Sequence, residues 1–209
     1  MNASYAWYDV YAELVNAMHD FYNTHKSNSS TKLYKLLKKH KAEYTELFTF
    51  SEKFFDSDAN KGFDPIHIFA SLNNYGIHPE VREKKILFYY KFFNISTKNL
   101  KNIDYDVFEY FPHVNIVHIV ANRRIKHQKE IWDYFNALCQ NNQKTLKHHF
   151  DESVKNWYGI AIPSLTIFMF WVMSQKYLPL DKNTVDCLET NGVISAFPSS
   201  YNKYMSLIH

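Results

Sequence analysis

Residues 7–21 read WYDVYAELVNAMHDF, and their apolar side chains recur at every third or fourth position. The recurring residues are Trp7, Tyr11, Leu14, Met18 and Phe21. This period corresponds to one face of an α-helix. The stretch therefore predicts an amphipathic helix over about residues 5–24, with Ser4 as its cap.

The same helical period continues along most of the chain, interrupted by polar loops. A second helix is expected to begin near residue 31, with Thr31 as its cap. Its outer face carries Lys32, Lys35, Lys38, Lys39 and Lys41. Asp64-Pro65 is typical of a helix start, since proline at the first helical position loses no hydrogen bond. Further helices are expected over 79–93, 124–140, 164–174, 181–191 and 200–208, with a short helix between Asp104 and Pro112 and one strand candidate at 114–120.

The pattern predicts an all-α fold with at most one or two short strands. The loop at residues 56–62 is the best candidate boundary. We expect an N-terminal helical extension over 1–62 and a compact helical recognition domain over 63–209, or one continuous domain over 1–209.

Glycine is scarce and aromatic residues are abundant. Only 4 of 209 residues are Gly, whereas 18% are Phe, Trp or Tyr. The phosphate-binding loops of P-loop and dinucleotide-binding proteins need clustered glycines, and neither glycine motif is present. These residues therefore hold no nucleotide site of either kind, and no cofactor is expected. Most aromatic residues recur at helical spacing, which predicts core packing rather than base stacking.

Charge and cysteine content favour a reduced, cytoplasmic setting. The net charge is +3, with 21 Lys and 3 Arg. Cys139 and Cys187 stand alone, without the C-x-x-C spacing of a zinc site. The N-terminus lacks the pattern of a signal peptide, and the apolar stretch 158–173 is too short to span a bilayer. We therefore expect no membrane association.

No residue pattern predicts a catalytic or metal centre. The 11 histidines lack the H-E-x-x-H spacing of a zinc site, and no nucleophile elbow is present. The segment Glu83-Lys84-Lys85 has the E-x-K form of a nuclease metal site, but it follows a helical pattern. We interpret it as a solvated helix face.

The densest basic cluster spans residues 123–129 and precedes the first acid, Glu130. Its cations can neutralise phosphates of DNA or RNA, although such a run is also typical of a solvated helix face. The candidate phosphate-binding residues in this cluster are Arg123, Arg124, Lys126 and Lys129. The lysines of the helix near residue 31 form a second, weaker candidate.

Three stretches together resemble a known family: residues 63–73 (FDPIHIFASLN), 159–184 (beginning GIAIPSLTIFMFW and ending YLPLDKNT) and 198–204 (PSSYNKY). They are similar to N-terminal regions of bacterial McrB-like AAA+ proteins, the GTPase subunits of modification-dependent restriction systems. The resemblance implies a module that binds DNA, modified or not, and that works with an AAA+ motor segment or a nuclease subunit. The motor motifs are absent from these residues.

A second resemblance concerns Asp181. Gly159, the following apolar helix and residues 179–181 look like the end of a helix-hairpin-helix DNA glycosylase, in which an Asp supports base excision. The L-P-G-x-G hairpin of those enzymes is absent. Asp181 also has a structural role to play, as the cap of the helix that follows.

We therefore expect a non-catalytic DNA-recognition module of a McrB-type restriction or antiviral defence system. Lys182 and Asn183, at a helix start, are expected to add phosphate contacts to those of the basic cluster. A protein-interaction module with an exposed apolar patch is the first alternative. A glycosylase-like enzyme that uses Asp181 is the second.

Overall fold

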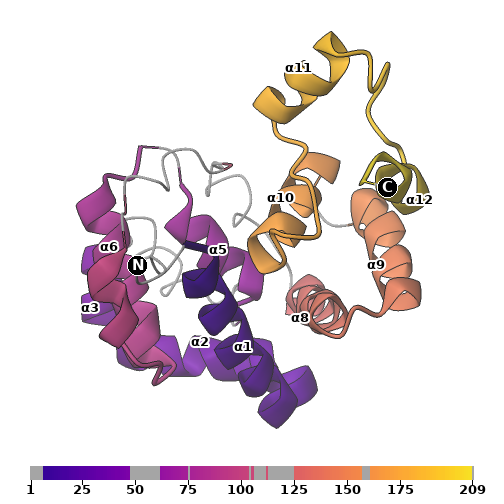
Figure 1. Cartoon of the computed structure of the whole chain (residues 1–209). Helices are drawn as coiled ribbons and strands as arrows, with labels where there is room; N and C mark the ends of the chain where they lie inside the picture. The colour runs from indigo at the N-terminus through magenta and orange to yellow at the C-terminus, as the bar shows by residue number, and fades with distance from the viewer. Residues whose placement is uncertain are drawn as a thin grey trace.

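The computed structural model describes residues 7–47, 62–74, 76–103, 105, 112, 125–156 and 161–208. Within these ranges the chain is helical with no β-sheet, so the predicted all-α class is confirmed (Figure 1). The predicted cap Asp104, the strand candidate at 114–120 and the cluster residues Arg123 and Arg124 lie outside the described residues.

The N-terminal helices turn around one side of the molecule. Helix α1 (Trp7–His25) confirms the predicted amphipathic helix, and its buried face includes Leu14 and Met18. A short 3-10 turn, η1 (Lys26–Asn28), leads into α2 (Ser29–Lys39), which starts two residues before the predicted cap. Helix α3 (Lys41–Leu47) follows.

The central helix, α5 (Pro65–Leu72), is buried along its whole length. Its start is fixed by a capping box, in which the Asp64 side chain accepts the His67 N–H at 3.1 Å. This reciprocal cap satisfies backbone N–H groups that would otherwise lack partners. Helix α6 (Pro79–Phe92) and the 3-10 turn η2 (Lys98–Asn102) come next.

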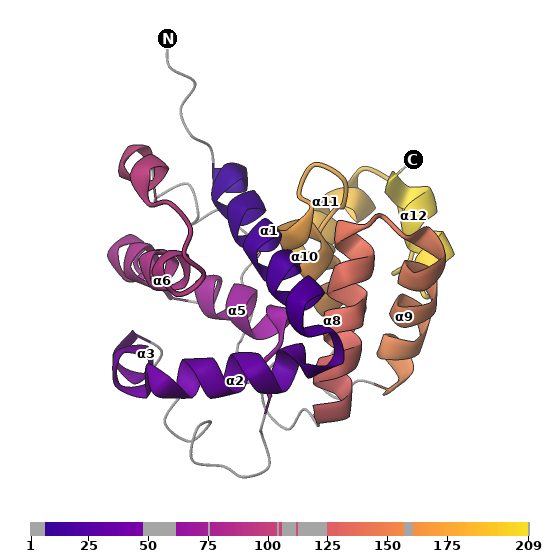
Figure 2. The same cartoon turned by 90° about the horizontal axis from the view of Figure 1, so that it is seen from below.

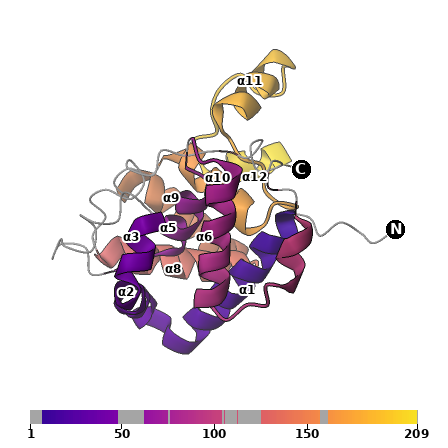
Figure 3. The ribbon, with the colours of Figure 1, turned by 90° about the vertical axis from the view of Figure 1, so that its left-hand side faces the viewer.

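The second half of the chain begins with the hairpin of α8 (Ile125–Cys139) and α9 (Gln143–Asn156). Helix α10 (Ile162–Val172) packs against α1, α5 and α8. An extended segment then leads to α11 (Lys182–Thr190), which projects from the body of the molecule (Figure 3). The last helix, α12 (Tyr201–Ile208), returns to pack on α9.

A single core, rich in aromatic residues, joins these helices. Helices α1 and α5 both pack against α8 (Figure 2). The Trp132 indole N–H donates to the Phe63 carbonyl at 2.9 Å, and the Tyr90 hydroxyl donates to the Val10 carbonyl at 3.0 Å. Residues 7–47 contribute to the same hydrophobic cluster as α5, α8 and α10, so this segment packs against the rest of the chain without a core of its own.

No helix in the described part of the chain is both long enough and apolar enough to cross a bilayer.

Candidate nucleic-acid interface

Helix α2 carries a row of exposed lysines. Residues 21–42 contain six lysines and neither Asp nor Glu. Leu33, Tyr34 and Leu37 are buried on the inner face of the helix, which leaves the opposite face to the cations. The exposed lysines of α2 are Lys32, Lys35, Lys38 and Lys39.

The row is regular because its members follow the helical repeat. Lys32, Lys35 and Lys39 are spaced at three and four positions, so they share one face. At 1.5 Å per residue they span about 10 Å along the helix axis. Lys38, three residues after Lys35, is also exposed, and its ammonium lies 5.9 Å from the centre of the Tyr34 ring. A single edge of α2 therefore presents a line of positive charge to solvent.

The start of α2 is fastened to the first turn of α8. The buried Ser30 hydroxyl donates to Gln128 Oε1 at 3.0 Å, and the Phe63 N–H donates to the Ser30 carbonyl at 3.1 Å. A Cβ at Gly62 would lie 1.9 Å from Gln128 Oε1, so this approach leaves no room for a side chain at residue 62. Lys129, next to Gln128, is exposed.

The two basic segments that the sequence treats separately are therefore neighbours in space (Figure 2). Of the predicted cluster, Lys129 is exposed on the first turn of α8, next to the residue that contacts α2. Arg123 and Arg124 lie outside the described residues, as does the side chain of Lys126. We call the exposed lysines of α2 together with Lys129 the basic surface.

Lys182 and Asn183 do not join the basic surface. Both are exposed at the start of α11, at the opposite end of the molecule from α2 (Figures 1 and 3). The Asp181 side chain accepts the Thr184 N–H at 2.8 Å, which confirms its predicted role as a cap. The Asp181 carboxylate thereby occupies the N-terminus of α11, the place where a phosphate could bind. Its negative charge also repels a phosphate.

The segment Glu83-Lys84-Lys85 departs from its predicted role as a solvated face. Glu83 and Lys84 are exposed, but Lys85 is only 6% exposed and donates to the Ser71 carbonyl at 3.1 Å. Arg82 is fully buried and donates through Nε to the Leu72 carbonyl at 3.0 Å.

Both buried cations donate hydrogen bonds to carbonyl groups at the C-terminal end of α5. Carbonyl groups at the end of a helix lack helical partners and carry partial negative charge, so the cations stabilise them. Burial, with a contribution from the Arg82 charge, lowers the pKa of Lys85 to about 8. Arg82 and Lys85 fall on the same helical stripe as Ile86 and Tyr89, a sign of burial that the sequence already contained.

A hollow of about 390 Å³ opens between α1, α2 and the end of α6. Phe92 and Phe93 line it from α6, Phe21 from α1 and His40 from the end of α2. The sequence predicts the phenylalanines of this hollow to be core, because the aromatic residues recur at helical spacing. One sequence signal pointed the other way: residues 86–90 of α6 are five consecutive hydrophobic residues, more than one buried face needs.

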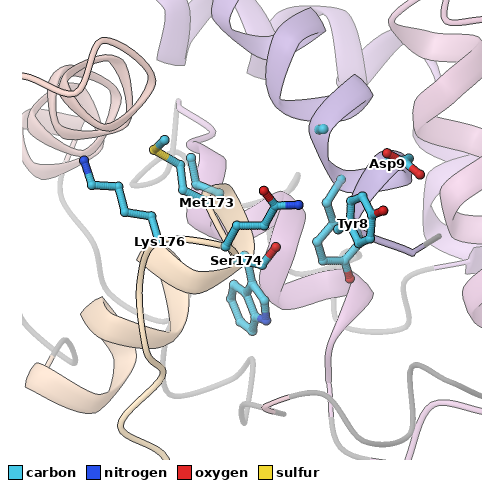
Figure 4. Close-up of a pocket in the computed structure, with 10 residues that line it drawn as sticks. Tyr8, Asp9, Met173, Ser174 and Lys176 are labelled. Atoms are coloured by element: carbon cyan, nitrogen blue, oxygen red, sulfur yellow. The ribbon is translucent and has the colours of Figure 1, made fainter. Parts of the chain in front are cut away.

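A second hollow, of about 320 Å³, lies between the start of α1 and the segment after α10 (Figure 4). Asp9 and Lys176 lie at its opposite ends. The Lys176 ammonium donates to Asn141 Oδ1 and lies 5.5 Å from the Tyr177 ring centre. Because its lining cation is already engaged and its other charged side chain is an acid, this hollow does not suit a phosphate.

An exposed apolar area lies between α11 and α12. Val193 is 56% exposed and Phe197 is 42% exposed. They line a hollow of about 270 Å³ together with Ile194 and Leu207. Exposed apolar groups that gather in this way are typical of protein-interaction sites.

The described residues contain no cluster of three or more His, Cys, Asp or Glu side chains suited to a metal. Both cysteines are free thiols. Burial raises the pKa of Cys139 to about 12, which makes this thiol unreactive at neutral pH.

The model of one family, described as a domain of unknown function (DUF8425), matches residues 7–209, and the chain belongs to that family. No curated protein and no solved structure matches the chain.

Proposed function

We propose that this DUF8425 chain is a DNA-recognition module without catalytic activity of its own, and that it binds the phosphate backbone through the basic surface. One observation carries the proposal: helix α2 packs against the start of α8. Helix α2 bears exposed lysines and lies in a stretch of sequence, residues 21–42, that contains no acidic residue. Lysines that neutralise phosphates release counterions, which gives binding that depends steeply on salt.

The biological setting is also part of the proposal. The resemblance to McrB-like proteins supports a role in a restriction or antiviral defence assembly of the bacterial cytoplasm. In such an assembly an AAA+ motor segment or a nuclease subunit would act on the DNA that this module holds. The absence of glycine-rich phosphate loops from the sequence supports this division of labour.

Binding of a fluorescently labelled DNA duplex, measured by anisotropy over a series of salt concentrations, tests the proposal. The double variant Lys35→Gln/Lys39→Gln removes two cations from the exposed edge of α2. Each lost phosphate contact lowers the slope of log affinity against log salt by about 0.9, so the expected decrease is up to about 2.

The matched control is Lys144→Gln/Lys203→Gln, which removes the same charge from exposed positions on α9 and α12. Its slope should stay at the wild-type value. Equal losses in both double variants would show a general charge effect, and no binding at any salt concentration would refute the proposal.

A second candidate function rests on the exposed Val193 and Phe197. If this area docks another subunit of the assembly, Phe197→Ser should abolish that association. Cross-linking of the purified complex should then join the partner to residues around 193–197. Cross-links confined to other elements would exclude this area as the docking site.

A further inference from the structure

We propose that the hollow between α1, α2 and the end of α6 receives an unpaired base of single-stranded DNA, while lysines of α2 hold the neighbouring phosphates. This inference rests on the proposed function and names its substrate class. We call this hollow the aromatic hollow; it is lined by Phe21, His40, Phe92 and Phe93.

The aromatic hollow holds a continuous series of rings. The Phe92 and Phe93 rings are 5.0 Å apart and perpendicular, at 88°. The His40 ring lies 5.9 Å from Phe92, and Phe21 lies 6.1 Å from Phe93. His40 is exposed and the three phenylalanines are half-buried, so the rings are held by the core yet reach the surface. Neighbouring rings of this series meet edge to face, at 80° to 88°, so a base would stack on the face of a single ring. Any base can do so, because every base has a π-face.

Cations border the aromatic hollow on its α2 side. Leu36 of α2 lines the hollow. Lys32 precedes Leu36 by four residues and Lys39 follows Leu36 by three, so both lysines are neighbours of Leu36 on the helix surface. Asp20 is the acidic residue of the lining and belongs to α1. Its charge repels phosphate, so the DNA backbone is expected along α2 rather than α1.

The geometry favours an unpaired base over a duplex. The faces of bases stacked in a duplex are covered by their neighbours, and a base must leave the stack to enter a pocket. An oligonucleotide that is already single-stranded needs no such unstacking. A volume of about 390 Å³ also falls within the range of small-molecule pockets.

The experiment compares a labelled single-stranded oligothymidine with a labelled duplex of the same length, using the full chain. Phe92→Leu removes a ring while keeping an apolar side chain, and His40→Ala removes the exposed ring. Each should weaken single-strand binding by about tenfold or more, in the range for losing one stacked base, and leave duplex binding within about twofold. Tyr8→Leu, at an exposed aromatic residue near the start of α1 that does not line the aromatic hollow, is the matched control and should change neither.

Circular dichroism melting shows whether each variant folds. If Phe92→Leu does not fold, His40→Ala still provides the test. Unchanged single-strand affinity in a folded ring variant would overturn the aromatic hollow as a base site. If Lys35→Gln/Lys39→Gln still reduced duplex binding in that case, the proposed function would stand. If the wild type bound neither DNA, the proposed function would fail as well.

Discussion

The burial of Lys85 makes the stability of the fold depend on pH in the alkaline range. Lys85 is only 6% exposed, and its charge is close enough to that of Arg82 to be disfavoured by it. Both effects disfavour the charged form, and the pKa falls from 10.5 to about 8 on folding. The perturbation that tests this is Lys85→Met, which keeps a long apolar side chain and removes the titrating group.

The sign follows from proton binding. Between pH 8 and 10.5 the unfolded chain holds a proton on Lys85 that the folded chain has lost, so the Lys85 contribution to the free energy of unfolding rises with pH. At 1.36 kcal/mol per pKa unit, the expected rise in that contribution between pH 7 and pH 10 is about 2 to 3 kcal/mol. Burial raises the pKa of the Cys139 thiol to about 12 and also raises the pKa of Tyr11 and Tyr89, so the contributions of these groups fall as the pH approaches 10. The Lys85 contribution is therefore the difference between the wild type and Lys85→Met.

Urea unfolding of the wild type and of Lys85→Met at several pH values from 7 to 10, followed by circular dichroism, measures the Lys85 contribution as the difference between the two profiles. In Lys85→Met the contribution of about 2 to 3 kcal/mol should disappear. The matched control is Lys84→Met, its exposed neighbour on α6, which should retain the wild-type profile. Parallel profiles for the wild type and Lys85→Met would refute the reasoning, because they would mean that folding does not perturb Lys85.

Three further predictions concern other parts of the molecule. Gly62→Ala should lower the free energy of unfolding by about 1 kcal/mol in the same urea assay, because the new Cβ displaces Gln128 from its hydrogen bond with Ser30; full stability would contradict the close approach. Asp181→Asn should melt near the wild-type temperature, since Asn also caps helices, and neither protein should create abasic sites in modified DNA. Abasic sites made by the wild type and lost in Asp181→Asn would instead establish the glycosylase alternative. Arg123→Ala/Arg124→Ala should flatten the salt dependence of duplex binding, and an unchanged slope would remove both arginines from the interface.

Local features of the sequence determined the helices. The apolar period of residues 7–21, the Asp64-Pro65 start and the Asp181 cap each act within one or two helical turns, so they can be interpreted without knowledge of the fold. Helix α9 received no prediction, because its only buried apolar residues among those described are Leu146 and Phe150.

Tertiary structure decided which of these helices are in contact. It thereby also decided which residues form the candidate site. Ser30 and Gln128 are 98 residues apart in sequence, and only folding brings α2 beside the basic start of α8. The burial of Lys85 likewise depends on where α5 ends. The rings of His40 and Phe92 line a shared hollow because folding brings the end of α2 to the end of α6, with the two rings 5.9 Å apart. Composition and periodicity describe one helix at a time, whereas charge alignment, desolvation and ring clustering depend on the neighbours that packing supplies.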